Sequence, residues 1–174
     1  MITVIGTLGT IRDIETFVQK LGRLSEKEKI VIQALSASVV YGKEHLVSAA
    51  MHAMRAFEQK TNATNSLALE VLLYAAGERQ IHKAIKKMGV KKGKQTIAFV
   101  LIDTIKKKPD TKRMDAIIQD ILEMFHLIGD DTVLQGNRDT LKKFGITDKE
   151  IGTISESKYG DLVLEKVALV DVIK

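Results

Sequence analysis

Three segments of the chain carry the hydrophobic pattern of β-strands. Near the start, Ile2 and Val4 flank a threonine, so that apolar and polar positions alternate. Residues 29–37 (KIVIQALSA) form a short, largely apolar run, and residues 95–103 (QTIAFVLID) form the clearest one, preceded by Gly93. Short runs of this kind with turn-forming boundaries are typical of buried strands.

Other segments place apolar residues three or four positions apart, which predicts helices. Ser, Asp and Asn are favoured at helix N-termini, and Gly is favoured just past the C-terminus. On these grounds we expect helices over residues 10–21 (apolar positions Ile14, Phe17, Val18 and Leu21), within a region from Gly42 to Met88, after Asp110, from Asn137 to Gly145, and from Tyr159 to about Leu169.

Strands on both sides of a helical insert predict an α+β fold, with a small, mainly antiparallel sheet packed with several helices. The chain has 174 residues. Since domains average roughly 150 residues, we expect one α+β domain over residues 1–174, with the helical insert at about 43–89.

The first helix of the insert has two different sides at 100° per residue. One side is apolar and predicts a core face (Leu46, Val47, Ala50, Met51, Ala53, Met54 and Phe57). The opposite side collects polar and small residues (Glu44, His45, Ser48, Ala49, His52, Arg55, Ala56 and Gln59). That second side is either a solvated surface or a shallow docking groove around the alanines.

The second helix of the insert, SLALEVLLYAA, is apolar almost all round and should be central and buried. Asn65 or Ser66 is its expected N-cap. Glu70 is its only charge, and it either points out through a gap or pairs with a neighbouring base. As a catalytic carboxylate, it would need a second titratable group nearby in the fold.

The third helix of the insert separates charge from apolar residues most sharply. Arg79, Lys83, Lys86 and Lys87 share one side, and Ile81, Ala84, Ile85 and Met88 share the other. The following loop, GVKKGK, adds Lys91, Lys92 and Lys94 without any acidic residue. Such a cluster of lysines is either a solvated face or a contact for phosphate groups.

The charge balance points to the same segment. The net charge is +5. Between Lys43 and Lys94 there are ten basic and four acidic residues, so this segment holds all of the excess positive charge. A surplus of this size permits an anionic partner.

The sequence offers little for enzyme chemistry. It has no cysteine, which excludes disulfides, thiolate metal sites and a cysteine nucleophile. His45 and His52 lie about 10 Å apart along one helix, too far to chelate one metal. GVKKGKQT lacks the spacing of a phosphate-binding loop, and no glycine-rich dinucleotide fingerprint is present. We therefore expect no catalytic residues, no metal and no cofactor.

The expected compartment is the cytoplasm. No stretch approaches the roughly 18 consecutive apolar residues of a membrane span. The opening MITVIGTLGT lacks the basic region and long apolar core of a secretory signal.

Three segments together resemble a known family: VVYGKEHLVSAAMHAMRAF, NSLALEVLLYAAGERQIHKAIKKMGV and EKVALVD. The most specific block runs from Glu70 to Gly89, with the pattern E-x-L-x-Y-x-x-G-x-R-Q-I-x-x-A-I-x-x-x-G. The sequence resembles the archaeal type of the PRPK-binding protein (TPRKB) family, which supplies a small subunit of the KEOPS complex. The resemblance covers essentially the whole chain.

The resemblance implies a function in tRNA modification. KEOPS helps to make threonylcarbamoyladenosine at position 37 of tRNAs that read ANN codons. The TPRKB-type subunit is non-catalytic, docks on the kinase-like ATPase subunit, and contacts the remaining KEOPS subunits through it. In archaea it also binds the single-stranded 3′ CCA end of tRNA. The family fold implied is a mixed α and β domain, a small sheet with helices around it.

Individual contacts follow as hypotheses. We expect tRNA binding by basic residues (Arg79, Lys83, Lys86, Lys87, Lys91 and Arg55), which would hold phosphates, and by side chains that would contact bases (His45, His52 and Gln80). We expect kinase docking by the apolar C-terminal residues (Val167, Leu169, Val170, Val172 and Ile173). The competing hypotheses are a purely protein-binding regulator without RNA contact, and a small enzyme using His45, His52 or Glu70.

Overall fold

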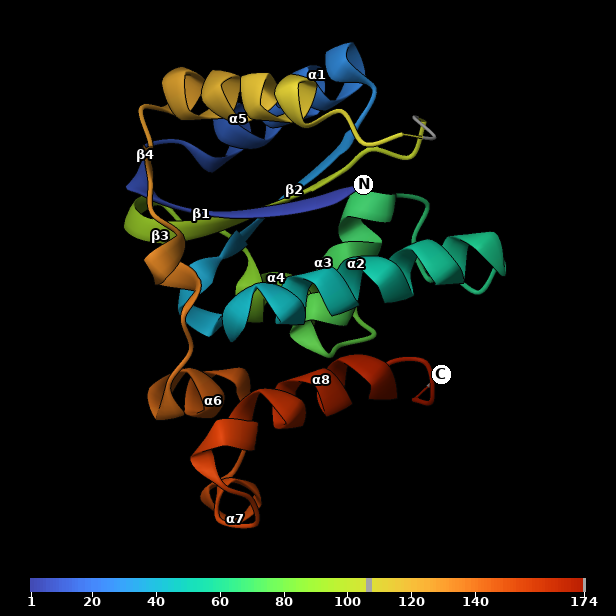
Figure 1. Cartoon of the computed structure of the whole chain (residues 1–174), viewed down its shortest axis with the longest axis vertical. Coiled ribbons are helices and arrows are strands. Elements are labelled where there is room, and N and C mark those ends of the chain that lie inside the picture. The colour runs from blue at the N-terminus through green and yellow to red at the C-terminus, as the bar shows by residue number, and fades with distance from the viewer. Residues whose placement is uncertain (106–107, 174) are drawn as a thin grey trace.

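The computed structural model of the chain describes residues 1–105 and 108–173. Among these residues, four strands form one antiparallel sheet in the order β2-β3-β1-β4 (Figure 1). The α+β class with a small antiparallel sheet is confirmed. The strands are β1 (Ile2–Ile11), β2 (Val31–Ser36), β3 (Gly93–Ile102) and β4 (Ile128–Gly129).

Strand β3 explains why the sheet is covered on both faces. It lies between β1 and β2, and its side chains alternate between two hydrophobic cores. Ile97, Phe99 and Leu101 belong to one core, while Ala98, Val100 and Ile102 belong to the other. Every residue from 97 to 102 is buried, because both faces of this central strand are covered. A strand covered on both faces has a continuous apolar sequence, as this segment does.

Two helices cover the first face, α1 (Ile14–Glu28) and α5 (Thr111–Phe125) (Figure 1). Asp110 caps α5 as predicted, accepting a hydrogen bond from the Arg113 amide. The predicted start of the first helix at residue 10 is wrong, because β1 continues through Ile11. Asp13 is the true N-cap of α1, where its carboxylate accepts from the Thr16 amide at 2.6 Å.

The helical insert covers the second face with α2 (Gly42–Glu58), α3 (Leu67–Ala76) and α4 (Ile81–Met88). Helix α3 is buried along most of its length, as its apolar sequence predicts. Ser66 is its N-cap, and Gly77 ends it with a φ of 64°, a left-handed conformation that favours glycine.

The remaining elements form an outer layer beyond α2–α4 (Figure 1). The predicted helix after Asn137 is present, and Gly145 ends it. The predicted C-terminal helix is also present and ends at Leu169. The layer contains α6 (Arg138–Phe144), α7 (Asp148–Ile151) and α8 (Tyr159–Leu169); short 3-10 turns η1, η2 and η3 occupy Ala37–Val39, Asp131–Leu134 and Glu156–Lys158.

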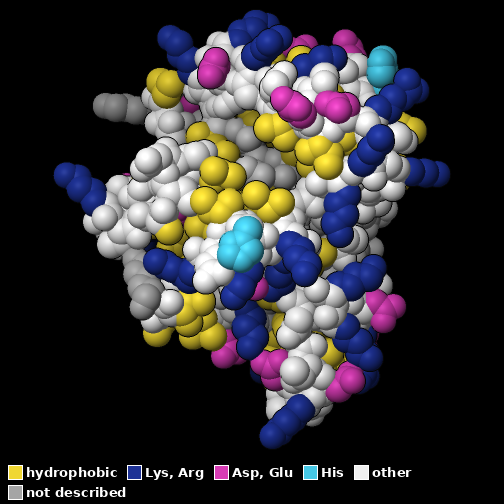
Figure 2. Space-filling model, turned by 180° about the vertical axis from the view of Figure 1, so that it is seen from behind, with side chains coloured by type: hydrophobic (Ala, Val, Ile, Leu, Met, Phe, Trp, Pro, Cys, Tyr) yellow, Lys and Arg dark blue, Asp and Glu magenta, His cyan; other side chains and the backbone are white. Residues whose placement is uncertain are grey.

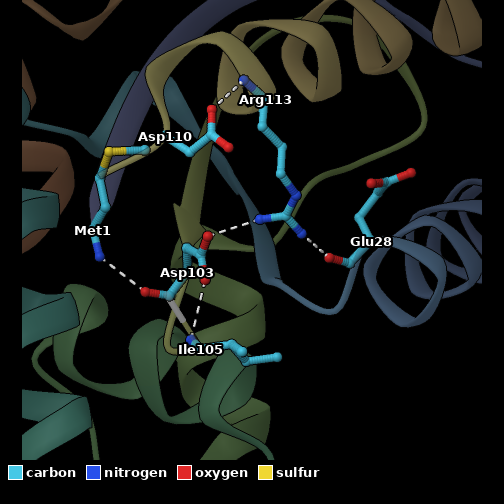
Figure 3. Close-up of polar contacts among 6 residues, drawn as sticks. All are labelled: Met1, Glu28, Asp103, Ile105, Asp110 and Arg113. Carbon is cyan, nitrogen blue, oxygen red and sulfur yellow. Dashed lines mark hydrogen bonds and ion pairs between the residues drawn. The ribbon is translucent and has the colours of Figure 1, made fainter. Parts of the chain in front are cut away.

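A polar cluster joins the first helical layer to one end of the sheet (Figure 3). The Asp103 carboxylate, buried just after β3, pairs with the Arg113 guanidinium at 2.7 Å. The same guanidinium donates to the carbonyl oxygen of Glu28, the last residue of α1. The Met1 ammonium donates to the Asp103 carbonyl at 2.9 Å. This cluster therefore connects the start of β1, the end of β3, the end of α1 and the start of α5.

Candidate RNA and partner interface

The outer side of α4 presents lysines to solvent. Lys83 and Lys86 are exposed, and Lys91, Lys92 and Lys94 continue the exposed series through the loop into β3. Figure 2 shows Lys and Arg side chains spread across the middle and right of one face of the molecule, around a central histidine. Among residues 1–105 and 108–173, no carboxylate forms an ion pair with these five lysines. Their charges therefore remain available to an anion.

Lys87 does not share this arrangement, although it is adjacent to Lys86. Its ammonium donates to the Ala76 carbonyl oxygen at 2.6 Å and lies 3.8 Å from the ring centroid of Phe144. Burial lowers the pKa of Lys87, and the nearby Glu78 carboxylate opposes this shift. The prediction that Lys87 lies on the open basic face is wrong, because the side chain turns inward to the end of α3.

His45 is also in the interior, with 1% of its surface exposed. Its Nδ1 accepts from the Tyr41 amide at 3.2 Å, so its Nε2 carries the proton and donates to the Ala75 carbonyl at 2.8 Å. Burial lowers the pKa of His45 to about 4. The expectation of an RNA-facing ring at this position is wrong.

The same correction applies to the small-residue side of α2. Ala49 and Ala56 are buried, so the groove proposed around them does not exist. One stripe along α2, at spacing i, i+4, i+7 and i+11, consists of His45, Ala49, His52 and Ala56. Both histidines of this stripe contact α3. The stripe is a helix-packing face.

His52 and Tyr74 hold the segment that follows α8. The His52 Nδ1 lies 2.9 Å from the Asp171 carboxylate, and the Tyr74 hydroxyl donates to the other oxygen of the same carboxylate. The two rings are stacked with centroids 5.5 Å apart. Burial, and then the bond to Asp171, raise the pKa of the Tyr74 hydroxyl. Arg79 adds a bond from its guanidinium to the Val170 carbonyl at 3.3 Å.

The C-terminal residues predicted to dock a partner separate into two groups. Val167 and Val170 are buried in the core, which contradicts their placement on a docking surface. Leu169, Val172 and Ile173 are exposed by 37%, 74% and 55%. We call the contacts of the Asp171 carboxylate with His52 and Tyr74 the Asp171 clamp. The clamp fixes the chain between the buried Val170 and the exposed Val172 and Ile173.

Two further predicted contacts are on the surface. Arg55 is exposed near the end of α2, and Gln80 is exposed at the N-cap of α4. The Gln80 side chain makes no capping hydrogen bond. Arg55, Lys83, Lys86 and Lys91 form no ion pair within the part of the chain that the structure describes, so their donors are accessible to a ligand, as is the exposed Gln80 amide.

Glu70 has a structural role that neither sequence interpretation anticipated. It is buried, and its carboxylate accepts from the amides of Ala63 and Thr64 and from the Thr64 hydroxyl, at 2.9–3.2 Å. The carboxylate thus fixes the loop before α3. Because most of these donors are backbone amides of a loop, the sequence pattern around Glu70 does not indicate them.

Within the described residues, no group of three or more His, Cys, Asp or Glu side chains is placed to hold a metal ion. None of the helices in that part of the chain is both long enough and apolar enough to cross a membrane.

Two surface features are those of a binding protein: a basic face without ion pairs to the described carboxylates, and a C-terminal end whose partly exposed apolar residues are held in place. The family described as kinase binding protein CGI-121 matches this chain over residues 10–171. The regulatory protein Cgi121 of Methanocaldococcus jannaschii is 32% identical over 148 residues, which are 82% of this chain and 84% of that protein. The chain belongs to the CGI-121 family, and the resemblance drawn from the Glu70–Gly89 block is confirmed.

Proposed function

We propose that this protein is a non-catalytic subunit of the KEOPS complex, which makes threonylcarbamoyladenosine at position 37 of tRNA. It docks on the kinase-like ATPase subunit and binds the single-stranded 3′ CCA end of tRNA. Membership of a family described as kinase-binding supports the docking half. The basic face of α4 supports the RNA half.

The observation that carries the RNA half is the set of exposed cations on α4 and its loop, which form no ion pair with any other described residue. Lys83, Lys86 and Lys91 provide charge for phosphates. Gln80 and Arg55 provide donors for base edges or a planar group for stacking on an unpaired base. His52 and Arg79 do not contact the RNA directly in this proposal, because their polar atoms already bond to the C-terminal segment.

The docking half is carried by Leu169, Val172 and Ile173. These residues are exposed apolar side chains next to a segment that three polar contacts fix in place. A pre-ordered apolar surface loses less conformational entropy on association than a free tail would.

The RNA half is tested by fluorescence anisotropy with intact tRNA and with the same tRNA lacking its 3′ CCA, at two salt concentrations. We expect tighter binding of the intact tRNA. The double variant Lys83→Gln/Lys86→Gln should lower this affinity and flatten its salt dependence. Lys149→Gln, at an exposed lysine of α7, is the control and should change neither. Equal affinity for the two tRNAs would instead support a purely protein-binding regulator.

The docking half is tested by removing the residues after Asp171, which keeps the clamp. Binding to the kinase-like subunit, measured by calorimetry, should weaken while the melting temperature stays unchanged. Removing the residues after Val170 also deletes Asp171 and should lower the melting temperature. Unchanged calorimetric binding after the shorter deletion would contradict the assigned surface.

A further inference from the structure

A groove of about 670 Å³ opens at the end of the sheet far from the Asp103 cluster. It lies between the last residues of β1, the first turns of α1 and the end of α5. Lys94 of β3 and Ile128 of β4 also line it. The cluster in Figure 3 lies at the opposite end of the sheet and does not hold these walls together.

The rim of the groove is basic. Arg12 follows β1, Lys20 lies on α1, and Lys94 lies on β3, and all three are exposed. Within the part of the chain that the structure describes, none of them forms an ion pair. His126, also exposed, ends α5 at the same groove.

The floor of the groove is apolar. Phe125 is partly buried, and its ring centroid lies 4.4 Å from that of Phe17. Met124 and Ile128 are exposed beside it. Phe17 itself is buried, so the accessible part of the floor comes from Phe125, Met124 and Ile128. A basic rim over an apolar floor suits a ligand that carries phosphates beside weakly polar rings.

One carboxylate lines the groove, that of Asp13. It is already engaged as the cap of α1, and the hydrogen bond from the Thr16 amide, with Lys92 contributing, lowers its pKa. Among the described residues that line the groove, three cations therefore face one satisfied carboxylate. Asp120 and Glu123 border only the adjoining depression, which Lys20 also lines together with Arg23 and Lys27.

The groove continues the basic face of α4. In the sheet, Thr10 pairs with Lys94 and Ile11 pairs with Gly93, which brings the end of β1 beside the loop that carries Lys91 and Lys92. Lys92 is close enough to Asp13 to act on its charge. In Figure 2, Lys and Arg side chains extend from the upper right of the face to its middle. The exposed lysines of the loop after α4 thus adjoin the end of β1, where the groove opens.

We propose that this groove is a second RNA contact, which takes the phosphate backbone of the strand leading away from the end held at α4. The inference rests on the proposed function. An RNA chain fits better than an acidic peptide because the rim cations adjoin the exposed lysines of the loop after α4, and one phosphate backbone presents a charge at every nucleotide to both. The groove adds affinity for RNAs longer than the single-stranded terminus.

The test compares two RNAs, a full-length tRNA and a tetranucleotide ending in CCA. In the double variant Arg12→Gln/Lys20→Gln, which leaves Lys94 of the α4 loop series intact, affinity for the tRNA should fall about ten- to thirtyfold near 0.1 M salt, and the slope of log K against log salt should fall by about 1.5. Affinity for the tetranucleotide should be unchanged. Lys83→Gln/Lys86→Gln should weaken both RNAs, and Lys149→Gln should weaken neither.

Each result separates the two proposals. Unchanged tRNA affinity in the double variant, with both RNAs still sensitive to the α4 variant, overturns the groove and keeps the α4 site. Loss of kinase-subunit binding without loss of RNA binding also overturns it, because the groove would then be a protein site. Failure of the wild-type protein to distinguish intact tRNA from tRNA without CCA overturns the proposed function itself. Should the double variant melt early, Arg12→Gln and Lys20→Gln singly should each lower the slope by about 0.7.

Discussion

The α2–α3–α8 interface and the outer side of α4 both contain histidines and basic residues, but they use them differently. In the interface, His45, His52 and Arg79 all bond to groups of the chain itself. On α4, Lys83 and Lys86 bond to no carboxylate among the described residues. Lys86 and Lys87 show the difference between adjacent positions, since only Lys87 turns toward Ala76 and Phe144.

This comparison teaches that residue type alone does not identify a binding residue. A side chain whose polar atoms are satisfied inside the fold stabilises the protein, and its loss is measured as unfolding. A charged side chain that remains unpaired contributes little to stability and is free to contribute to binding. The variants below are ordered by expected effect, and each tests on which side of this division a residue lies.

The strongest test is Glu70→Ala. The substitution leaves the buried amide of Thr64 and that of Ala63 without their acceptor, so we expect a loss of about 3 kcal/mol in the free energy of unfolding. For a protein of this size, the melting temperature should fall by roughly 10 °C. Glu58→Ala, at an exposed position of α2, is the matched control. A loss of less than about 1 kcal/mol in the free energy of unfolding, measured by denaturant titration, would show that Glu70 contributes little to stability.

The second test is the pH dependence of stability. Since burial holds the pKa of His45 near 4, below the unfolded value of about 6.5, the unfolded state binds the proton first. His45 should therefore stabilise the fold fully above about pH 6.5 and lose this contribution as the pH falls toward 4. The change is of the order of 3 kcal/mol.

The control for this effect is His45→Gln, which does not titrate. Its unfolding free energy should be lower at pH 7 and flatter between pH 7 and 4 than that of the wild type. Parallel curves for the two proteins would show that His45 protonates freely in the folded state.

The third test is Lys87→Met, which keeps the length of the side chain and removes the charge. The end of α3 loses a cation at its carbonyls and Phe144 loses its cation–π partner, so stability should fall by about 1–2 kcal/mol. RNA affinity should not change. Normal stability together with weaker RNA binding in this variant would show that Lys87 binds RNA and does not stabilise the fold.

The smallest expected effect is that of Lys86→Met, the neighbouring change. Stability should stay within about 0.5 kcal/mol of wild type, as for most exposed positions. Affinity for tRNA should fall about fivefold near 0.1 M salt, with a loss of about 0.7 from the salt slope. Measuring Lys86→Met and Lys87→Met side by side by anisotropy and thermal melting sharpens the comparison more than either alone.

The sequence predicted the elements well because their signals are local. The run from Ile97 to Ile102 has no polar position, and Ser66, Asp110 and Asn137 each cap the helix that follows. The one clear boundary error came from extending a helical period back to Thr10 past the capping signal of Asp13.

The site was harder to predict because burial depends on neighbours distant in sequence. On α2, one apolar stripe already predicts a core face, so the sequence pattern predicts that the opposite, polar side is exposed. A second stripe was present at His45, Ala49, His52 and Ala56, and small residues at such spacing are a signal of close helix packing. No local pattern indicates that Asp171 would meet His52, 119 positions earlier.

The position of the Asp103 cluster has a consequence for local opening of the molecule. Helices α1 and α5 are fastened to the sheet at the end of α1 and the start of α5, while their other ends border the groove. The layer formed by α1 and α5 should therefore separate from the sheet first at the groove and last at the Asp103 cluster. In hydrogen exchange, amides in the first turns of α1 and the last turn of α5 should exchange before those beside Arg113.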